Sequence, residues 1–266
     1  MSELDGAPVT VDRLQVLAMY NYGHFTTMRV EDGRVRGLPL HLDRLSHDAR
    51  AVFDADIDPD RVLAYVRQAV GGRTGAVVVR VTVYDPALDL GHPGAEAHPH
   101  ILVTTRPAPN LPLSPLTVQL VQHARDSPAV KHVGLFGTVR CRRAAQRAGF
   151  DDVVFTGPDG VISEGATWNL GVVDPNGVRW PSAPALPGVT MALLQQVDTI
   201  PGVVAPVTVD DLRTAQAVFA TNAAFGVRPI ALVADETGTA RFTGVPAHPT
   251  VDALAAAYAE IKGDEL

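Results

Sequence analysis

Lys131 is the residue whose type says most about possible chemistry. The chain contains 22 lysines and arginines together, and only Lys131 and Lys262 are lysines. An arginine side chain stays protonated, whereas a lysine amine can lose its proton and form a Schiff base with an aldehyde. Lys262 stands near the C-terminus, where a solvated charge is expected. Lys131 is therefore the candidate nucleophile; the alternative is an ordinary surface residue.

Three other stretches carry residues that suit the chemistry of a lysine amine. Glu164 stands between a predicted strand and a corner of small residues, although a glutamate there can also protect a strand edge. Residues 186–190, Leu-Pro-Gly-Val-Thr, precede an amphipathic pattern over Met191–Val197, so N–H groups and the Thr190 hydroxyl could hold a phosphate. Residues 220–226 form a second small-residue corner, with Asn222 and Ala223. Pyridoxal phosphate needs these three things: a lysine, a carboxylate beside its pyridine nitrogen and a phosphate cup.

A hairpin is predicted around the Asp-Gly pair at 32–33, because β-branched and aromatic residues flank this turn signal. In its first strand Phe25, Thr27 and Arg29 share one face, by the two-residue period of a strand, and that face could line a pocket. The next segment, 40–50, has the pattern of an amphipathic helix. Arg44 lies among the polar residues of that helix, where its alternative role is an exposed charge.

The remaining pattern predicts an α/β (α+β) protein of two domains. Helices are expected over Pro59–Val70 and Thr138–Ala148, and strands over Gly75–Tyr84, His100–Thr105, Leu116–Gln122, Asp151–Thr156 and Ala217–Phe219. Residues 107–115 are rich in proline and suit a stiff linker. They separate a small domain, residues 1–106, from a larger domain, residues 116–266. The histidines of the loop over 85–99 match no metal site, so no metal is predicted.

Composition excludes several classes of function. A net charge of −7 and a pI near 5.7 disfavour nucleic-acid binding, which needs a basic face. No apolar run is long enough to span a membrane and no signal segment is recognised, so we expect a cytoplasmic protein without a membrane partner. The single cysteine, Cys141, cannot form an internal disulfide and is interpreted as a packing residue.

Taken in order, these motifs resemble the class IV aminotransferases, the fold-type IV pyridoxal-phosphate enzymes. The family's lysine resembles Lys131, and its Glu-x-x-x-x-Asn segment resembles Glu164 with Asn169. Its Leu-x-Gly-Ile-Thr segment resembles residues 186–190, which implies Leu186 against the cofactor ring and Val189 and Thr190 on the phosphate. Its His-x-x-Arg-Leu segment resembles residues 41–45, which implies Arg44 as a phosphate ligand. The corner at Asn222 and Ala223 completes the implied cofactor site, where Ala223 replaces a frequent Thr or Ser and offers only its N–H group.

The resemblance implies a cofactor between a small N-terminal and a larger C-terminal domain, in a homodimer whose partner lends a loop to each site. It implies a transaminase that moves an amino group between an amino acid and a 2-oxo acid through a Lys131 aldimine. The alternatives are a 4-amino-4-deoxychorismate lyase, which Phe25-Thr26-Thr27 favours, and an inactive member acting as a scaffold. Phe25, Thr27 and Arg29 are the expected substrate contacts. Arg29 is the candidate for the substrate carboxylate, with Arg80 or a residue of the partner chain as alternatives.

Overall fold

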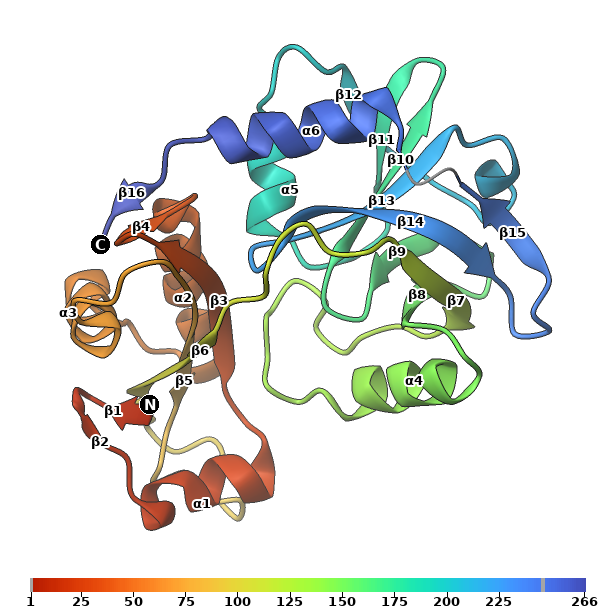
Figure 1. The fold of residues 1–266 in the computed structure, drawn as a ribbon. Helices are drawn as coiled ribbons and strands as arrows, with labels where there is room; N and C mark the ends of the chain where they lie inside the picture. Colours follow the sequence, from red (N-terminus) through yellow and green to blue (C-terminus); the bar gives the residue numbers. More distant parts are fainter. Residues whose placement is uncertain (1, 245–246) are drawn as a thin grey trace. The chain divides into compact units, whose positions relative to one another are not determined.

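The computed structural model describes residues 2–244 and 247–266 and divides into two compact units. Unit 1 comprises Met1–Pro109, Val130–Gly134 and Lys262–Leu266, and unit 2 comprises Asn110–Ala129 and Leu135–Ile261. Each unit has its own sheet and its own core (Figure 1). Two short segments therefore join unit 1 although they are remote in sequence from the rest of it.

Unit 1 contains a seven-stranded antiparallel sheet in the order β16-β4-β3-β5-β6-β1-β2. The strands are β1 (Ser2–Leu4), β2 (Ala7–Pro8), β3 (His24–Glu31), β4 (Arg34–Val35), β5 (Ala76–Tyr84), β6 (His100–Pro107) and β16 (Asp264–Glu265). Asp32 and Gly33 join β3 to β4 with φ angles of 50° and 74°. A two-residue hairpin turn with positive φ at both positions is the turn that an Asp-Gly pair favours, so the predicted hairpin is present.

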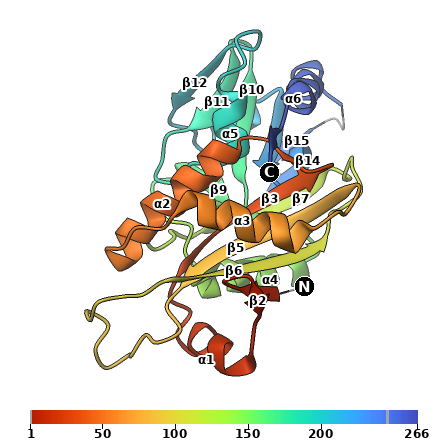
Figure 2. The same ribbon diagram turned by 90° about the vertical axis from the view of Figure 1, so that its left-hand side faces the viewer.

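Three helices complete unit 1: α1 (Val11–Tyr20), α2 (Leu38–Phe53) and α3 (Pro59–Val70). α2 and α3 cover one face of the sheet (Figure 2). Met28 and Val30 of β3 point into this core, together with Leu45 of α2 and Val62 of α3. Because side chains alternate along a strand, Phe25, Thr27 and Arg29 occupy the opposite face of β3, as the two-residue period indicates.

Unit 2 is built on a nine-stranded mixed sheet in the order β12-β11-β10-β13-β14-β7-β8-β9, with β15 paired to β14. The strands are β7 (Leu116–Gln122), β8 (Asp152–Thr156), β9 (Ile162–Gly165), β10 (Asn169–Asp174), β11 (Gly177–Pro181), β12 (Gly202–Ala205), β13 (Ala217–Asn222), β14 (Gly226–Ala234) and β15 (Ala240–Thr243). The helices are α4 (Phe136–Arg147), α5 (Val189–Leu194), the short 3-10 helix η1 (Asp211–Arg213) and α6 (Pro249–Glu260).

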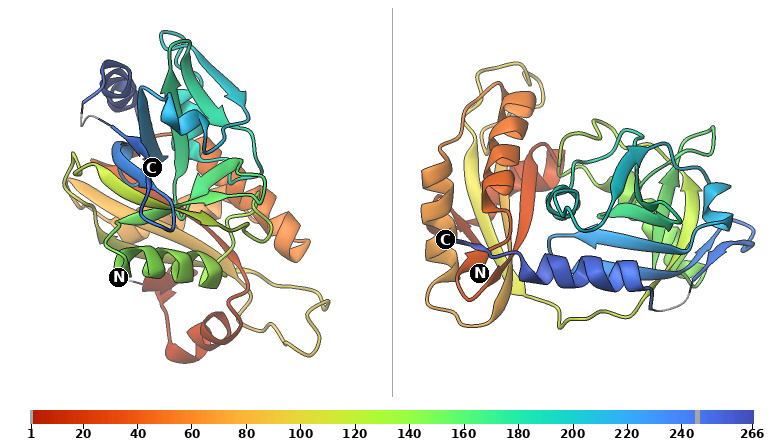
Figure 3. Two further views of the ribbon diagram at one scale, coloured as in Figure 1. Left: turned by 90° about the vertical axis from the view of Figure 1, so that its right-hand side faces the viewer. Right: turned by 90° about the horizontal axis from the view of Figure 1, so that it is seen from above.

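The faces of this sheet are buried in separate clusters. One cluster includes Leu120, Val154, Leu170 and Val218, from β7, β8, β10 and β13. Helix α4 packs against β8 (Figure 3). The side chains of Cys141 and Ala145 on α4 form a buried cluster with Val153 and Phe155 on β8, so Cys141 is a packing residue. A third cluster joins α5 and α6 to β10, β11 and β13. The strands that carry site residues therefore lie between packed layers.

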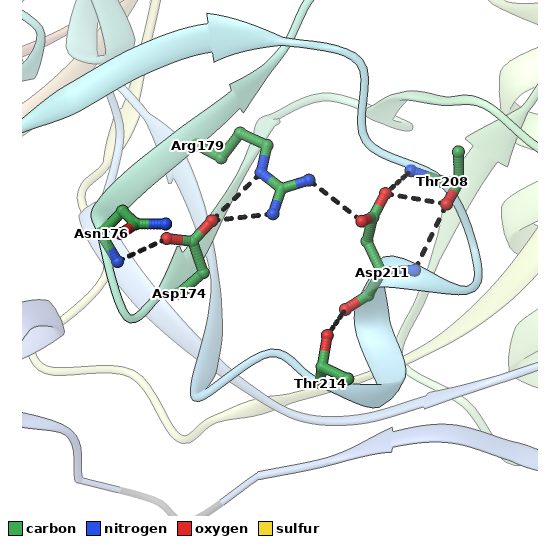
Figure 4. A network of polar contacts seen from close by, with 6 residues as sticks. All are labelled: Asp174, Asn176, Arg179, Thr208, Asp211 and Thr214. Carbon is green, nitrogen blue, oxygen red and sulfur yellow. Dashed lines mark hydrogen bonds and ion pairs between the residues drawn. The ribbon is translucent and has the colours of Figure 1, made fainter.

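A polar network fixes the β10–β11 hairpin to η1 (Figure 4). Arg179 donates to Asp174 at 2.7 Å and to Asp211 at 3.0 Å, and Asp211 also accepts from the main chain and hydroxyl of Thr208. Hydrogen bonds lower the pKa of both carboxyls, chiefly from Arg179 for Asp174 and from the main chain of Thr208 for Asp211. This network is structural and shares no residue with the predicted site.

Most predicted elements are present, with differences at their ends. Helix α3 has the predicted bounds, whereas α4 begins at Phe136 rather than Thr138. The helix expected over Met191–Val197 begins earlier and ends at Leu194, followed by hydrogen-bonded turns. No helix of the described ranges has the length and apolar character needed to cross a membrane.

Candidate functional site

Lys131 lies on a short stretch that pairs with β3 within unit 1. The N–H of Phe25 donates to the carbonyl of Lys131 at 2.9 Å, and the N–H of Val133 donates to the carbonyl of Gly23 at 2.9 Å. His24 and His132 form the bridge between these two bonds. Residues 130–134, which we call the lysine segment, thus extend the edge of β3 at its N-terminal end.

The amine of Lys131 lies over an aromatic ring on that same edge. Its Nζ atom is 4.9 Å from the centroid of the Phe25 ring, and Phe25 is buried. The N–H of Lys131 donates to Oδ2 of Asp48 at 3.0 Å. The structure therefore brings Lys131 together with Phe25, a predicted substrate contact, on the face of β3 opposite the helices.

Helix α2 presents polar groups to the buried side of β3. Nδ1 of His41 is 2.7 Å from the Thr26 hydroxyl, and burial lowers the pKa of His41 to about 3, helped by the charges of Arg44 and Lys131. Burial also lowers the pKa of Arg44, while Asp48 opposes that shift. Arg44 is thus not the exposed helix charge of the alternative interpretation; it lies within reach of the charges around Lys131.

Two arginines lie on the face of β3 and β5 that carries Phe25. Arg29 donates to the carbonyl of Pro109 at 3.0 Å and to Glu31 at 3.3 Å. Arg80 lies opposite Thr27 in the strand register, stacks 3.6 Å from the centroid of the Phe25 ring and donates from Nε to the Thr82 hydroxyl. Burial lowers the pKa of Arg80. Arg80 therefore contacts the Phe25 ring, over which the Lys131 amine also lies. Arg80 donates a hydrogen bond to one oxygen, that of Thr82, whereas Arg29 donates to two.

Glu164 is buried at the end of β9 in unit 2, and both of its carboxylate oxygens have partners. Nη1 of Arg125 donates to Oε1 at 2.9 Å, and the N–H of Leu186 donates to Oε2 at 3.3 Å. Charge-assisted bonds of this kind stabilise negative charge on a carboxylate. Arg125 was not selected from the sequence, because nothing in its local pattern separates it from the other arginines.

Asn169 fixes the path of the chain from Leu186 to Gly188. Its amide donates to the carbonyl of Leu186 at 2.8 Å. A Cβ atom on Gly188 would lie 1.9 Å from Oδ1 of Asn169, closer than any real contact, so only glycine fits there. Glu164 and Asn169 therefore both hold the segment that leads into α5, where Leu186, Val189 and Thr190 are buried.

The two predicted phosphate corners differ in what they offer. At the start of α5, the Thr190 hydroxyl is 3.4 Å from the hydroxyl of Tyr258. At the end of β13, Oδ1 of Asn222 accepts the N–H groups of Ala224 and Phe225, which gives the corner at Ala223 its shape. Thr221, which the sequence did not single out, is fully buried with a hydroxyl that has no hydrogen-bond partner.

A cavity of about 410 Å³ adjoins Glu164 in unit 2. Arg125, Ser163 and Glu164 supply polar groups to its wall, and Pro128, Phe155 and Pro184 supply apolar surface. The ion pair between Arg125 and Glu164 is thus next to open space on one side.

Comparison with known proteins places this chain in a family. The family model described as amino-transferase class IV matches residues 23–233. A Methanocaldococcus jannaschii protein assigned as a branched-chain-amino-acid aminotransferase is 26% identical over 226 residues, which cover 80% of this chain and 78% of that protein.

Two solved structures are similar in fold. The branched-chain aminotransferase of Thermoproteus uzoniensis with norvaline has a TM-score of 0.84 and 19% identity, covering 97% of this chain and 93% of that one. A hypothetical aminotransferase of Mycobacterium tuberculosis in its pyridoxal-phosphate-bound form has a TM-score of 0.78 and 19% identity, covering 97% of both chains. The family model spans most of the chain, from before Phe25 to near the end of β14, and on that evidence the protein belongs to the class IV aminotransferases.

Proposed function

We propose that this protein is a pyridoxal-phosphate-dependent aminotransferase that moves an amino group between an amino acid and a 2-oxo acid. The observation that carries the proposal is the setting of Lys131, whose main chain is held on both sides and whose amine lies over the Phe25 ring. Membership of the family supports it, as does the pyridoxal-phosphate-bound form of the similar Mycobacterium tuberculosis enzyme.

The residues present fit this cofactor. The buried Thr221 hydroxyl without a hydrogen-bond partner is a feature that a bound group explains, because unpaired buried polar atoms are costly. We propose that Lys131 and Arg44 in unit 1 hold the aldehyde carbon and the phosphate. In unit 2 the proposed contacts are Glu164, Asn169, Leu186, Val189, Thr190, Asn222 and Ala223. When bound, pyridoxal phosphate supplies an electron sink for the substrate's α-carbon.

The chain's own groups would divide the remaining work. The Lys131 amine is the candidate to take a proton from the α-carbon and to return it. Glu164 would keep the pyridine nitrogen protonated, and Arg125 supports this by stabilising negative charge on the Glu164 carboxylate. Phe25 gives the Lys131 amine an apolar floor that excludes water from one side.

The substrate carboxylate is better served by Arg80 than by Arg29. Arg29 already donates to Glu31 and to the carbonyl of Pro109. Arg80 stacks on Phe25, the ring that also lies under the Lys131 amine, and its guanidinium can offer a planar pair of donors. We therefore move the proposed carboxylate contact to Arg80 and keep Thr27, directly opposite it, as a residue that shapes the pocket.

The lyase alternative rests on a threonine that could relay a proton. Thr26 is fully buried and hydrogen-bonded to His41 on the helix side of β3. Thr27 is on the other face and only partly buried, so the structure favours Thr27 over Thr26 for that role. This leaves the lyase as a second candidate that depends on one hydroxyl.

One experiment separates the two activities. A transaminase loaded with cofactor is converted to its pyridoxamine form by an amino donor without any acceptor, which changes its visible spectrum. A lyase releases pyruvate from aminodeoxychorismate with no amino acceptor present. A spectrum that a broad panel of L- and D-amino acids leaves unchanged, together with pyruvate release, would contradict the transaminase proposal.

We also propose a homodimer, on the strength of the family resemblance. Light scattering coupled to size-exclusion chromatography measures the mass directly. The expected value is twice the 28.2 kDa of one chain.

A further inference from the structure

Asp48 is a carboxylate on α2 that solvent does not reach, with an exposed fraction of 0%. Its Oδ2 atom accepts the N–H of Lys131 at 3.0 Å, and its Oδ1 atom is 3.0 Å from Nδ1 of His47. Removing a carboxylate from water is expensive unless its oxygens are paired. The partners of Asp48 therefore indicate what this buried group does.

The lysine segment has little regular structure of its own to fix Lys131. It lies between β7 and α4, and its order comes from hydrogen bonds to β3 and α2. At Lys131 the carbonyl is held by the N–H of Phe25 and the N–H by Asp48. These two bonds fix both peptide groups of one residue, and so the direction in which its side chain leaves the main chain.

Asp48 also lies one helical turn after Arg44 on α2. Residues four apart on a helix are neighbours on one face, and the charge of Asp48 favours the charged form of Arg44. One helix thus carries the proposed phosphate ligand and the group that holds the main chain of Lys131.

We propose that Asp48 is a positioning residue that sets Lys131 relative to Arg44. The inference rests on the proposed function, because it assumes that these two residues hold one cofactor. Asp48 acts through the Lys131 N–H and has no chemical step of its own.

Three substitutions on the same helix separate the possibilities. Asp48→Ala removes the acceptor, Asp48→Asn keeps an oxygen for the Lys131 N–H while removing the charge, and Asp43→Asn is the matched control at an exposed position of α2. For each variant we would measure the dissociation constant of pyridoxal phosphate from the cofactor-free protein by fluorescence. The second readout is the fraction of cofactor that borohydride traps on Lys131.

A third readout needs no cofactor: the rate of amide hydrogen exchange at Lys131. We expect Asp48→Ala to weaken pyridoxal phosphate binding at least about tenfold and to accelerate exchange at Lys131 at least about tenfold. Asp48→Asn should remain within about threefold of the wild type in both, and Asp43→Asn should be unchanged. If Asp48→Ala does not fold, Asp48→Leu fills the volume without an acceptor and replaces it.

The inference is overturned if Asp48→Ala binds the cofactor and exchanges at Lys131 like Asp43→Asn, or if Asp48→Asn is as impaired as Asp48→Ala. A fall in melting temperature alone, without a change in cofactor affinity, would make Asp48 merely structural and would also overturn it. Failure of the proposed function looks different: the wild type itself then takes up no pyridoxal phosphate, whereas the exchange rate still reports whether Asp48 holds the lysine segment.

Discussion

On β3 and α2, unit 1 leaves buried polar atoms without partners, whereas around Glu164 unit 2 pairs nearly all of them. Within the described residues, the buried side-chain atoms that lack a hydrogen bond include both ring nitrogens of His24, Nε of Arg29 and Nε2 of His41, all in unit 1. In the described part of unit 2 the one such atom is the Thr221 hydroxyl oxygen. Each such atom costs about 1–3 kcal/mol.

Asp152, in unit 2, is by contrast a buried carboxylate whose two oxygens both accept hydrogen bonds. It accepts two bonds from Arg142, one from Nε1 of Trp168 and one from the N–H of Val153. Trp168 in turn lies on Gly165, beside Glu164. The polar groups beside Glu164 are therefore firmly held within unit 2, whereas β3 and α2 of unit 1 keep unused hydrogen-bonding capacity.

The largest effect should follow from removing the amine. Lys131→Ala should fold, because the main-chain hydrogen bonds of residue 131 to Phe25 and Asp48 remain, and it should lose measurable turnover. Borohydride reduction and peptide mapping of the wild type should place the cofactor on Lys131. Lys262→Ala is the control and should keep full activity; a label found on Lys262 would refute the assignment.

The hydrogen-bonded surroundings of Glu164 in unit 2 are tested by Glu164→Gln, which keeps the shape of the side chain and removes its charge. We expect turnover to fall by about 10²-fold, since the pyridine nitrogen loses its anionic partner, while the cofactor remains bound. Single-turnover kinetics with an amino donor measure this step. Wild-type rates in Glu164→Gln would mean that the pair with Arg125 only stabilises the fold.

The substrate side is tested by a pair of matched substitutions, Arg80→Lys and Arg29→Lys. A lysine cannot reproduce the planar bidentate contact of an arginine with a carboxylate. Substituting the arginine that binds the substrate carboxylate should therefore weaken substrate binding by about 1.5–3 kcal/mol and leave the cofactor spectrum unchanged. We expect this loss for Arg80→Lys. The opposite ranking of the two KM values would return the role to Arg29.

The smallest effect at neutral pH is expected for His24, whose protonation changes the stability of the protein only at lower pH. Burial lowers the pKa of His24 to about 4, against an ordinary value of 6.5, so the unfolded state takes up protons first as the pH falls. The contribution of neutral His24 to the free energy of unfolding is therefore fully present above pH 6.5. Between pH 6.5 and about 4 this histidine lowers the free energy of unfolding by about 1.4 kcal/mol for each pH unit. His41 adds a loss of the same sign.

His24→Phe should flatten that slope by the share of one histidine and should not destabilise the protein at pH 7, because it removes two unpaired nitrogens beside Phe53. Urea unfolding at several pH values measures both quantities. An unaltered slope in His24→Phe would show that His24 has the same pKa in the native and unfolded protein.

The sequence predicted the parts of this molecule that local pattern determines. The Asp32-Gly33 hairpin and the bounds of α3 follow from turn chemistry and helical periodicity. Lys131 stood out because lysine is rare in this chain. Asp48 and Arg125 did not, since their roles come from neighbours that are distant in sequence. The location of the lysine segment on β3 is equally non-local, and no periodicity indicates it.

The pairing of the lysine segment with β3 affects when, during folding, the protein becomes able to bind its cofactor. The lysine segment meets β3 and α2 across about a hundred residues of intervening chain, and contacts of such separation form late because a long loop must first be closed. The helices and hairpins of unit 1 can form earlier from nearby residues. Recovery of the lysine environment on refolding should therefore lag behind recovery of secondary structure, so a newly made chain would be compact before it is able to accept its cofactor.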